Sequence, residues 1–217
     1  NQIVDLVNRY LKNPRHPEWA SKWAQVYDQQ GMKRYAVVII HAASDFGDTT
    51  DASFASGFDS IAREVRNRTQ VDVGFFIDTL PRDFPALGRF KPNPETTRPF
   101  LWRSSSILGI QCFIPEIWMG STNTADVIRW KREFSRRWFQ TGIPFIMDVS
   151  PGYDAHIIFG GKGYGISAAW RNALSGMVRD FGTAGVMFNA WNGYTEGLVA
   201  VPTTEYGRDY FRWLQSL

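Results

Sequence analysis

Residues 143–150 have the sequence IPFIMDVS, which predicts a β-strand with apolar side chains on both faces. Strands of this kind are typical of parallel sheets, because helices cover both faces of such a sheet. The acid Asp148 closes the stretch, and the glycine-rich loop PGYDAHIIFGGKGYG follows it. Residues 167–182 then predict an amphipathic helix. Strand, loop and helix together indicate an α/β fold.

The same pattern recurs along the chain. The predicted buried strands are residues 35–44, 71–78, 107–118, 143–150 and 184–191. The predicted helices are residues 1–11, 52–68, 124–142, 167–182 and 206–217. In the helix over residues 124–142, Val127, Trp130, Phe134 and Trp138 form the inward stripe, so we expect the charges of RWKREFSRRW on a solvated outer face.

This alternation predicts a single domain over residues 1–217 with a parallel α/β sheet. No GxGxxG fingerprint follows the first strand, which argues against a dinucleotide-binding domain. The choice lies between an open sheet and a parallel (β/α) TIM-type barrel. About five strands fit a barrel that lacks its first strands, since a complete barrel has eight. The chain also opens directly into a helix, without an initiator Met, so we expect a truncated or processed protein. The helical spacing of the apolar residues predicts that this first helix turns the following side chains inward: Ile3, Val4, Val7, Tyr10 and Leu11.

The composition excludes several classes of partner. The formal net charge of +3 is spread along the chain, which predicts no nucleic-acid or membrane partner. No apolar run reaches the roughly 18 residues that span a bilayer. The single cysteine, Cys112, allows no intrachain disulfide, and its apolar surroundings predict a buried small side chain rather than a nucleophile. The sequence does not determine the compartment, and a secreted or periplasmic location is the favoured expectation.

Polar and aromatic side chains gather at the predicted strand ends, where parallel α/β folds place their active sites. In chain order they are His41, Asp78, Glu116, Trp118, Asp148, Tyr153, Trp191, Asn192, Tyr194 and Glu196. Taken singly, such an acid often caps a helix, and such a histidine is often structural. Together, carboxylates beside aromatic rings indicate glycosidic bond chemistry. One acid protonates the leaving oxygen, and a second carboxylate acts as base or nucleophile.

Motifs of other chemistries are missing from the sequence. The chain holds no G-x-S-x-G, no H-E-x-x-H and no C-x-x-C, so neither an α/β-hydrolase nor a zinc site is indicated. The stretch GGKGYG lacks the GK[ST] ending of a phosphate loop. We therefore expect a carbohydrate ligand, no metal and no organic cofactor.

The stretch W-N-G-Y-T-E-G at residues 191–197 is followed by V-P-T-x-E-Y-G at 201–207 and a short aromatic helix. It resembles the last strand of glycoside hydrolase family 99 and its endo-α-mannosidase-like relatives, where the pattern is W-N-E-W-x-E-G. The stretches RYLKNP and GMKRYAVVIIHA resemble a passage midway round the same (β/α)₈ barrel. The resemblance implies that the chain covers the later half to two thirds of such a barrel.

The resemblance also implies roles for two positions. The family's second glutamate, its general acid/base, falls on Glu196. The first glutamate assists the sugar's 2-hydroxyl as the internal nucleophile, and it falls on Gly193. This departure leaves alternatives open. Either another strand-end carboxylate supplies the second acid (Asp148, Glu116 or Asp78), or the protein binds glycans without cleaving them.

Our first hypothesis is a glycoside hydrolase-like enzyme that cleaves an oligo- or polysaccharide, with Glu196 as acid/base and Asp148 or Glu116 as its partner. The residues expected to bind the sugar are Trp191, Asn192, Tyr194, Trp118, Tyr153, His41 and Asp78. The alternative is a catalytically inactive carbohydrate-binding protein on a similar barrel. A third possibility is an α/β protein whose strand-end acids are structural.

Overall fold

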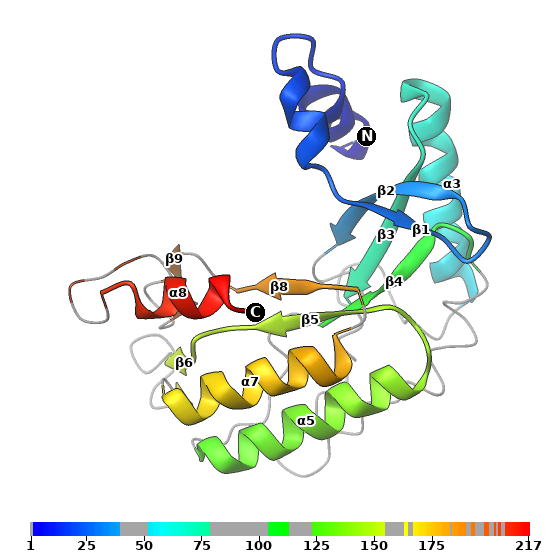
Figure 1. Cartoon of the computed structure of the whole chain (residues 1–217). Helices are drawn as coiled ribbons and strands as arrows, with labels where there is room; N and C mark the ends of the chain where they lie inside the picture. The colour runs from blue at the N-terminus through cyan, green and yellow to red at the C-terminus, as the bar shows by residue number, and fades with distance from the viewer. Residues whose placement is uncertain are drawn as a thin grey trace. The chain divides into compact units, whose positions relative to one another are not determined.

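The computed structural model describes residues 2–39, 52–78, 104–112, 123–154, 163–164, 167–182, 184–189, 192–193, 198–199, 202, 204 and 207–217. The chain divides into two compact units (Figure 1). The first unit consists of residues 1–79 and 95–110, and the second of residues 80–94 and 111–217.

The first unit opens with the predicted helix. It runs as α1 (Gln2–Leu6), continues as the π-helix η1 (Val7–Leu11), and is followed by the 3₁₀-helix η2 (Pro17–Lys22). Three of the predicted inward residues are buried: Val4, Val7 and Leu11. Tyr10 was predicted wrongly, because it is 46% exposed. The prediction assumed α-helical periodicity, whereas the wider winding of the π segment turns position 10 away from the stripe.

Four strands form the sheet of the first unit in the order β1-β2-β3-β4. They are β1 (Gln25–Tyr27), β2 (Lys33–Ile39), β3 (Val73–Asp78) and β4 (Ile107–Gln111), whose last residue falls in the second unit. β1 pairs with β2 as an antiparallel hairpin, and β2 pairs with β3 in parallel. β1 was not predicted, since three residues are too short to show a strand pattern.

The strands of the first unit differ in how far they are buried. β3 and β4 are buried along their whole length, which confirms the prediction for both. β2 was predicted to be buried on both faces, but only Val37 is, and its neighbour Val38 is 39% exposed. An apolar run shows that residues are hydrophobic, but it does not show what covers each face of the strand. In β2, alternate residues lie on opposite faces and differ in their exposure to solvent. Cys112, directly after β4, is buried as predicted.

Helix α3 (Ala52–Thr69) packs against the sheet of the first unit. Phe58, Ala62 and Val65 of this helix are buried. The Phe58 ring lies 5.2 Å from that of Phe75 in β3. β3 and β4 are also closely packed. A Cβ atom added at Gly74 of β3 would lie only 2.6 Å from the side chain of Leu108 in β4.

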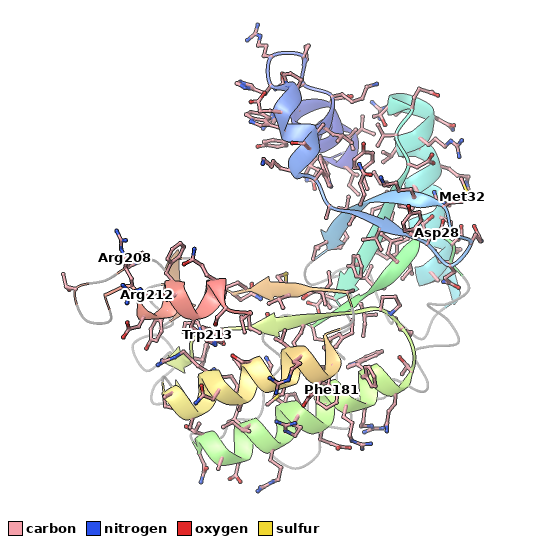
Figure 2. The ribbon with its side chains drawn as sticks, viewed as in Figure 1. Asp28, Met32, Phe181, Arg208, Arg212 and Trp213 are labelled. Carbon is pink, nitrogen blue, oxygen red and sulfur yellow. The ribbon has the colours of Figure 1, made fainter. Side chains whose placement is uncertain are left out.

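The turn between β1 and β2 is built around Asp28, which Figure 2 shows beside Met32. Its Oδ1 accepts hydrogen bonds from the backbone N–H groups of Gln30 at 2.9 Å and Met32 at 2.8 Å. Its Oδ2 accepts a hydrogen bond from Arg34 Nε at 2.8 Å. Burial raises the pKa of Asp28, but the hydrogen bonds from Met32, Arg34 and Gln30 outweigh it, so this pKa lies below its ordinary value.

The second unit holds the parallel pair β5 (Phe145–Val149) and β8 (Val186–Phe188). Helices α5 (Thr124–Gln140) and α7 (Ala168–Phe181) lie side by side along β5 (Figure 1). Both begin at caps: the Asn123 side chain accepts from Ala125 N and Asp126 N, and the Ser167 side chain accepts from Trp170 N. These elements confirm the predicted strand–helix order.

Two short ribbons and a last helix complete the second unit. β6 (Tyr153–Asp154) pairs with β7 (Gly163–Tyr164), so the predicted glycine-rich loop begins and ends in an antiparallel ribbon. β9 (Asn192–Gly193) pairs with β10 (Leu198–Val199), and α8 (Asp209–Gln215) closes the chain. β8 is less buried than predicted, with Val186 38% exposed.

The described residues therefore form a mixed α/β fold in which parallel strands alternate with helices. Their principal strands are β1 to β5 and β8, fewer than the eight parallel strands of a complete barrel. They do not make a full barrel. None of the helices in the described ranges is long and apolar enough to cross a membrane.

Candidate active site

Asp148 lies one residue before the end of β5 and is 2% exposed. The Nζ of Lys131, from α5, lies 3.5 Å from its Oδ2. The Nδ2 of Asn189, the residue directly after β8, donates a hydrogen bond to its Oδ1. The lysine is itself 2% exposed. A strand-end acid predicted from the sequence is therefore the centre of a buried ion pair that joins α5, β5 and the end of β8.

The backbone explains why these groups meet. In the parallel ladder Asp148 lies opposite Met187, and Val149 lies opposite Phe188. The ladder continues one step further, because the Asn189 N–H donates to the Val149 carbonyl at 2.9 Å. That bond brings the Asn189 side chain to the same strand end as the carboxylate.

Trp170, in the first turn of α7, covers the lysine. Its ring is fully buried, and its centroid lies 5.9 Å from the Lys131 Nζ, which is cation–π distance. Its Nε1–H donates to the Ser150 carbonyl, directly after β5, at 2.9 Å. Lys131, Asp148, Trp170 and Asn189 are called the buried ion-pair cluster below. Removing one partner from such a buried pair costs about 3–5 kcal/mol, since the other charge stays buried and unpaired.

Two further polar side chains are buried at strand ends. Both amide atoms of Gln111, the last residue of β4, lack a hydrogen-bond partner within the described part of the chain, as does the Ser150 hydroxyl. An unsatisfied buried polar group costs about 1–3 kcal/mol. A bound hydroxyl group or water at either side chain would remove this cost.

The sequence motif W-N-G-Y-T-E-G leaves the end of β8 within the same unit. Asn192 and Gly193 form β9 and pair with Val199 and Leu198 of β10. Helix α8, which carries Trp213 (Figure 2), supports β8. The Trp213 ring lies 6.5 Å from the Phe188 ring, and its Nε1–H donates to Ser175 Oγ of α7 at 2.9 Å.

The other predicted site residues divide into two groups. Tyr153 is buried at the start of β6, and Asp78 is fully buried as the last residue of β3, in the first unit. Six lie outside the described residues: His41, Glu116, Trp118, Trp191, Tyr194 and Glu196. Their roles, and those of Asp148, Asn192, Tyr153 and Asp78, stay predictions.

No group of three or more His, Cys, Asp or Glu side chains that could hold a metal ion occurs within the described ranges. The first unit contains a separate feature that the sequence did not indicate. An open hollow of about 450 Å³ is lined by Tyr10, Trp19, Lys22, Trp23 and Ala24. The Tyr10 and Trp19 rings lie 5.6 Å apart at one side of it.

Comparison with solved structures identifies the fold. A glycoside hydrolase-like protein matches 84% of this chain and 53% of its own, with a TM-score of 0.57 and 12% identity. The GH99 endo-α-mannosidase from Bacteroides thetaiotaomicron matches 99% of this chain and 60% of its own, with a TM-score of 0.53 and 14% identity. The fold is of the glycoside hydrolase family 99 type.

The chain spans between half and two thirds of the length of these two structures. No family model and no curated protein sequence matches the chain. At 12% and 14% identity the likeness supports the fold, which confirms the resemblance predicted from residues 191–207. It assigns no role to any residue of this chain.

Sequence reasoning missed three members of the cluster: Lys131, Trp170 as its cover, and Asn189. Lys131 was placed on the solvated face of α5, and this is wrong. A signal was available, because Lys131 lies four residues after Val127 and three before Phe134, both buried. A lysine on such an apolar stripe needs a buried partner. Asn189 gave a weaker signal, as the first polar residue after the run VMF.

Proposed function

We propose that this protein is a glycoside hydrolase-like enzyme that cleaves glycosidic bonds in an oligo- or polysaccharide. The observation that supports this most is the likeness of fold to the GH99 endo-α-mannosidase over 99% of the chain. The motif at residues 191–197 follows β8, which pairs with β5, the strand that carries the buried carboxylate of Asp148. We propose further that the chain forms part of a (β/α) barrel.

In this proposal Glu196 is the general acid/base that protonates the departing oxygen. Glu116 and Asp148 are the two candidates for the second carboxylate. A separation of about 5 Å between the two carboxyl groups would give retention, and about 6.5–9.5 Å would give inversion. Aromatic faces hold a sugar ring, and amide, imidazole and carboxylate groups bind its hydroxyls. The residues proposed for this are Trp191, Asn192, Tyr194, Trp118, Tyr153, His41 and Asp78.

A second function, carbohydrate binding without cleavage, is favoured by one specific observation. Gly193, in β9, occupies the position where the family pattern has a glutamate. The Asp148 carboxylate, a candidate to replace it, is engaged with Lys131 and Asn189. A protein with Glu196 alone would hold a sugar and lack the second carboxylate that hydrolysis requires.

A screen of the wild-type protein and Glu196→Gln against a broad oligosaccharide panel tests both functions, with binding and reducing-end release measured together. Glu133→Gln, which neutralises an exposed acid on α5, is the matched control. Cleavage by the wild type and by the control, with a loss of about 10²–10⁴-fold in Glu196→Gln, is the result expected of the enzyme. Equal binding and no cleavage by all three proteins would establish the binding protein. Neither binding nor cleavage by any of them would overturn both.

A further inference from the structure

We propose that Asp148 is a positioning residue and not one of the two reacting carboxylates. Its ion pair with Lys131 and its hydrogen bond from Asn189 would fix the end of β8, and with it the start of the segment that contains Glu196. This inference rests on the proposed function above, and it leaves Glu116 as the second carboxylate.

The surroundings of Asp148 suit a structural anchor. A reacting carboxylate must place an oxygen beside the sugar or its attacking water. Both oxygens of Asp148 are engaged already, Oδ1 by Asn189 and Oδ2 by Lys131. The residue is 2% exposed, so a sugar would have to displace a buried partner to reach it.

Asn189 lies close to the motif along the chain. It lies two residues before Trp191 and seven before Glu196. Its backbone N–H is bound to Val149 and its side chain to Asp148, so neighbouring residues of β5 hold it at two points. A change in either bond would move the start of the motif segment. A misplacement of about 1 Å can cost on the order of 100-fold in rate.

The charges of the cluster compensate each other. Lys131 and Asp148 are both buried and carry opposite charges, so each compensates the other. Removing one charge leaves an uncompensated ion beside the motif segment, whereas removing both together keeps the cluster neutral. An asparagine at position 148 would still accept the hydrogen bond from Asn189, because its side chain keeps the Oδ1 acceptor.

The test compares Lys131→Met, Asp148→Asn and the double variant Lys131→Met/Asp148→Asn on an oligosaccharide that the wild-type protein cleaves. If Asp148 is a positioning residue, each single variant should lose about 100-fold in kcat. The double variant should recover to within about tenfold of the wild type, since the neutral pair restores the anchor. If Asp148 reacts with the sugar, the double variant should remain as inactive as Asp148→Asn, and this result would overturn the inference.

Hydrogen exchange of the backbone amides in residues 186–199 provides a readout that needs no substrate. Lys131→Met should raise exchange there, and the double variant should return it toward the wild-type rate. Arg132→Met is the matched control. Arg132 follows Lys131 in α5 and forms an exposed ion pair with Asp180 of α7, so its loss should leave exchange unchanged. Unchanged exchange in folded Lys131→Met would also overturn the inference. A wild-type protein that cleaves nothing would count against the proposed function, while the exchange data would still decide whether the anchor exists.

Discussion

Asp28 and Asp148 are both buried carboxylates, yet their partners lie at different distances along the chain. Asp28 binds Gln30, Met32 and Arg34, which are two, four and six residues away. Asp148 binds Lys131 and Asn189, which are 17 and 41 residues away. The first carboxylate builds a local turn, and the second joins a helix and two strands.

The difference separates an acid that stabilises one local turn from an acid that joins distant elements at the candidate site. The bonds of Asp28 need only the hairpin of β1 and β2 to form, so their loss should be felt locally. The bonds of Asp148 form only when α5, β5 and β8 are all in place, so they report the assembly of the second unit at the strand end. Burial alone does not distinguish the two.

Lys131→Met should have the largest effect on stability. It leaves the Asp148 carboxylate buried without its cation, which should cost about 3–5 kcal/mol in free energy of unfolding. Urea unfolding measures this. Arg132→Met should cost only about 0–1 kcal/mol, since that ion pair is exposed on the same helix. Equal losses in the two variants would remove the distinction between the buried cluster and a surface pair.

Asp28→Ala should have the next largest effect. It removes the acceptor of two backbone N–H groups and of Arg34, and we expect a loss of about 2–3 kcal/mol. Hydrogen exchange should rise in β1 and β2, and exchange in residues 186–199 should not change. A rise of exchange in residues 186–199 would show that the effect of losing Asp28 is not local, and it would contradict the difference drawn between Asp28 and Asp148.

The pKa of Asp28 gives this prediction a pH dependence. Because the folded-state pKa lies below the ordinary value of 3.8, the ionised carboxylate stabilises the fold above that pH. This contribution should be lost as pH falls below about 4 and through the folded-state pKa. Asp28→Asn should flatten that part of the stability profile relative to the wild type. A variant profile that falls as steeply as the wild type would contradict the assignment.

Gly74→Ala tests packing in the first unit without changing any charge. Its Cβ would lie 2.6 Å from the buried Leu108 side chain, so we expect a loss of about 1–3 kcal/mol from overpacking. Gly57→Ala in α3 is the control, because no atom lies within 4 Å of its added Cβ, and it should stabilise by about 0.5–1 kcal/mol. Thermal unfolding of both variants measures the difference, and a neutral Gly74→Ala would show that Leu108 moves freely.

Ser167→Ala should have the smallest effect. It removes the side-chain acceptor for Trp170 N at the start of α7 and should cost about 1 kcal/mol. Since Trp170 covers Lys131, exchange in residues 186–199 should rise slightly, and much less than in Lys131→Met. An effect as large as that of Lys131→Met would mean that the helix cap, rather than the ion pair, holds the site.

Sequence patterns predicted the order of elements and the position of the strand-end acids. β3, β4 and β5 followed from continuous apolar runs, because burial on both faces leaves such runs. Asp78 and Asp148 were expected at the ends of those strands, and the structure places them on the last and the penultimate strand residue. Local patterns report which residues must be buried.

The remaining features depend on contacts between distant residues. Lys131 was assigned to solvent because its charge outweighed its place on the apolar stripe, and only Asp148, 17 residues away, explains its burial. Val38 and Val186 were expected inside because an apolar run does not show what covers it. Tyr10 turned outward where the helix changed its winding. Each of these errors concerns what packs beside a residue, and the periodicity of a sequence carries no information about those neighbours.

The most direct test of the account is a double-mutant cycle in free energy of unfolding for Lys131→Met and Asp148→Asn. Each single variant should be strongly destabilised and the double variant should be more stable than either, which corresponds to a coupling of more than about 3 kcal/mol. Losses that simply add would show that the two groups do not compensate each other. The buried ion-pair cluster would then not be what holds the end of β8.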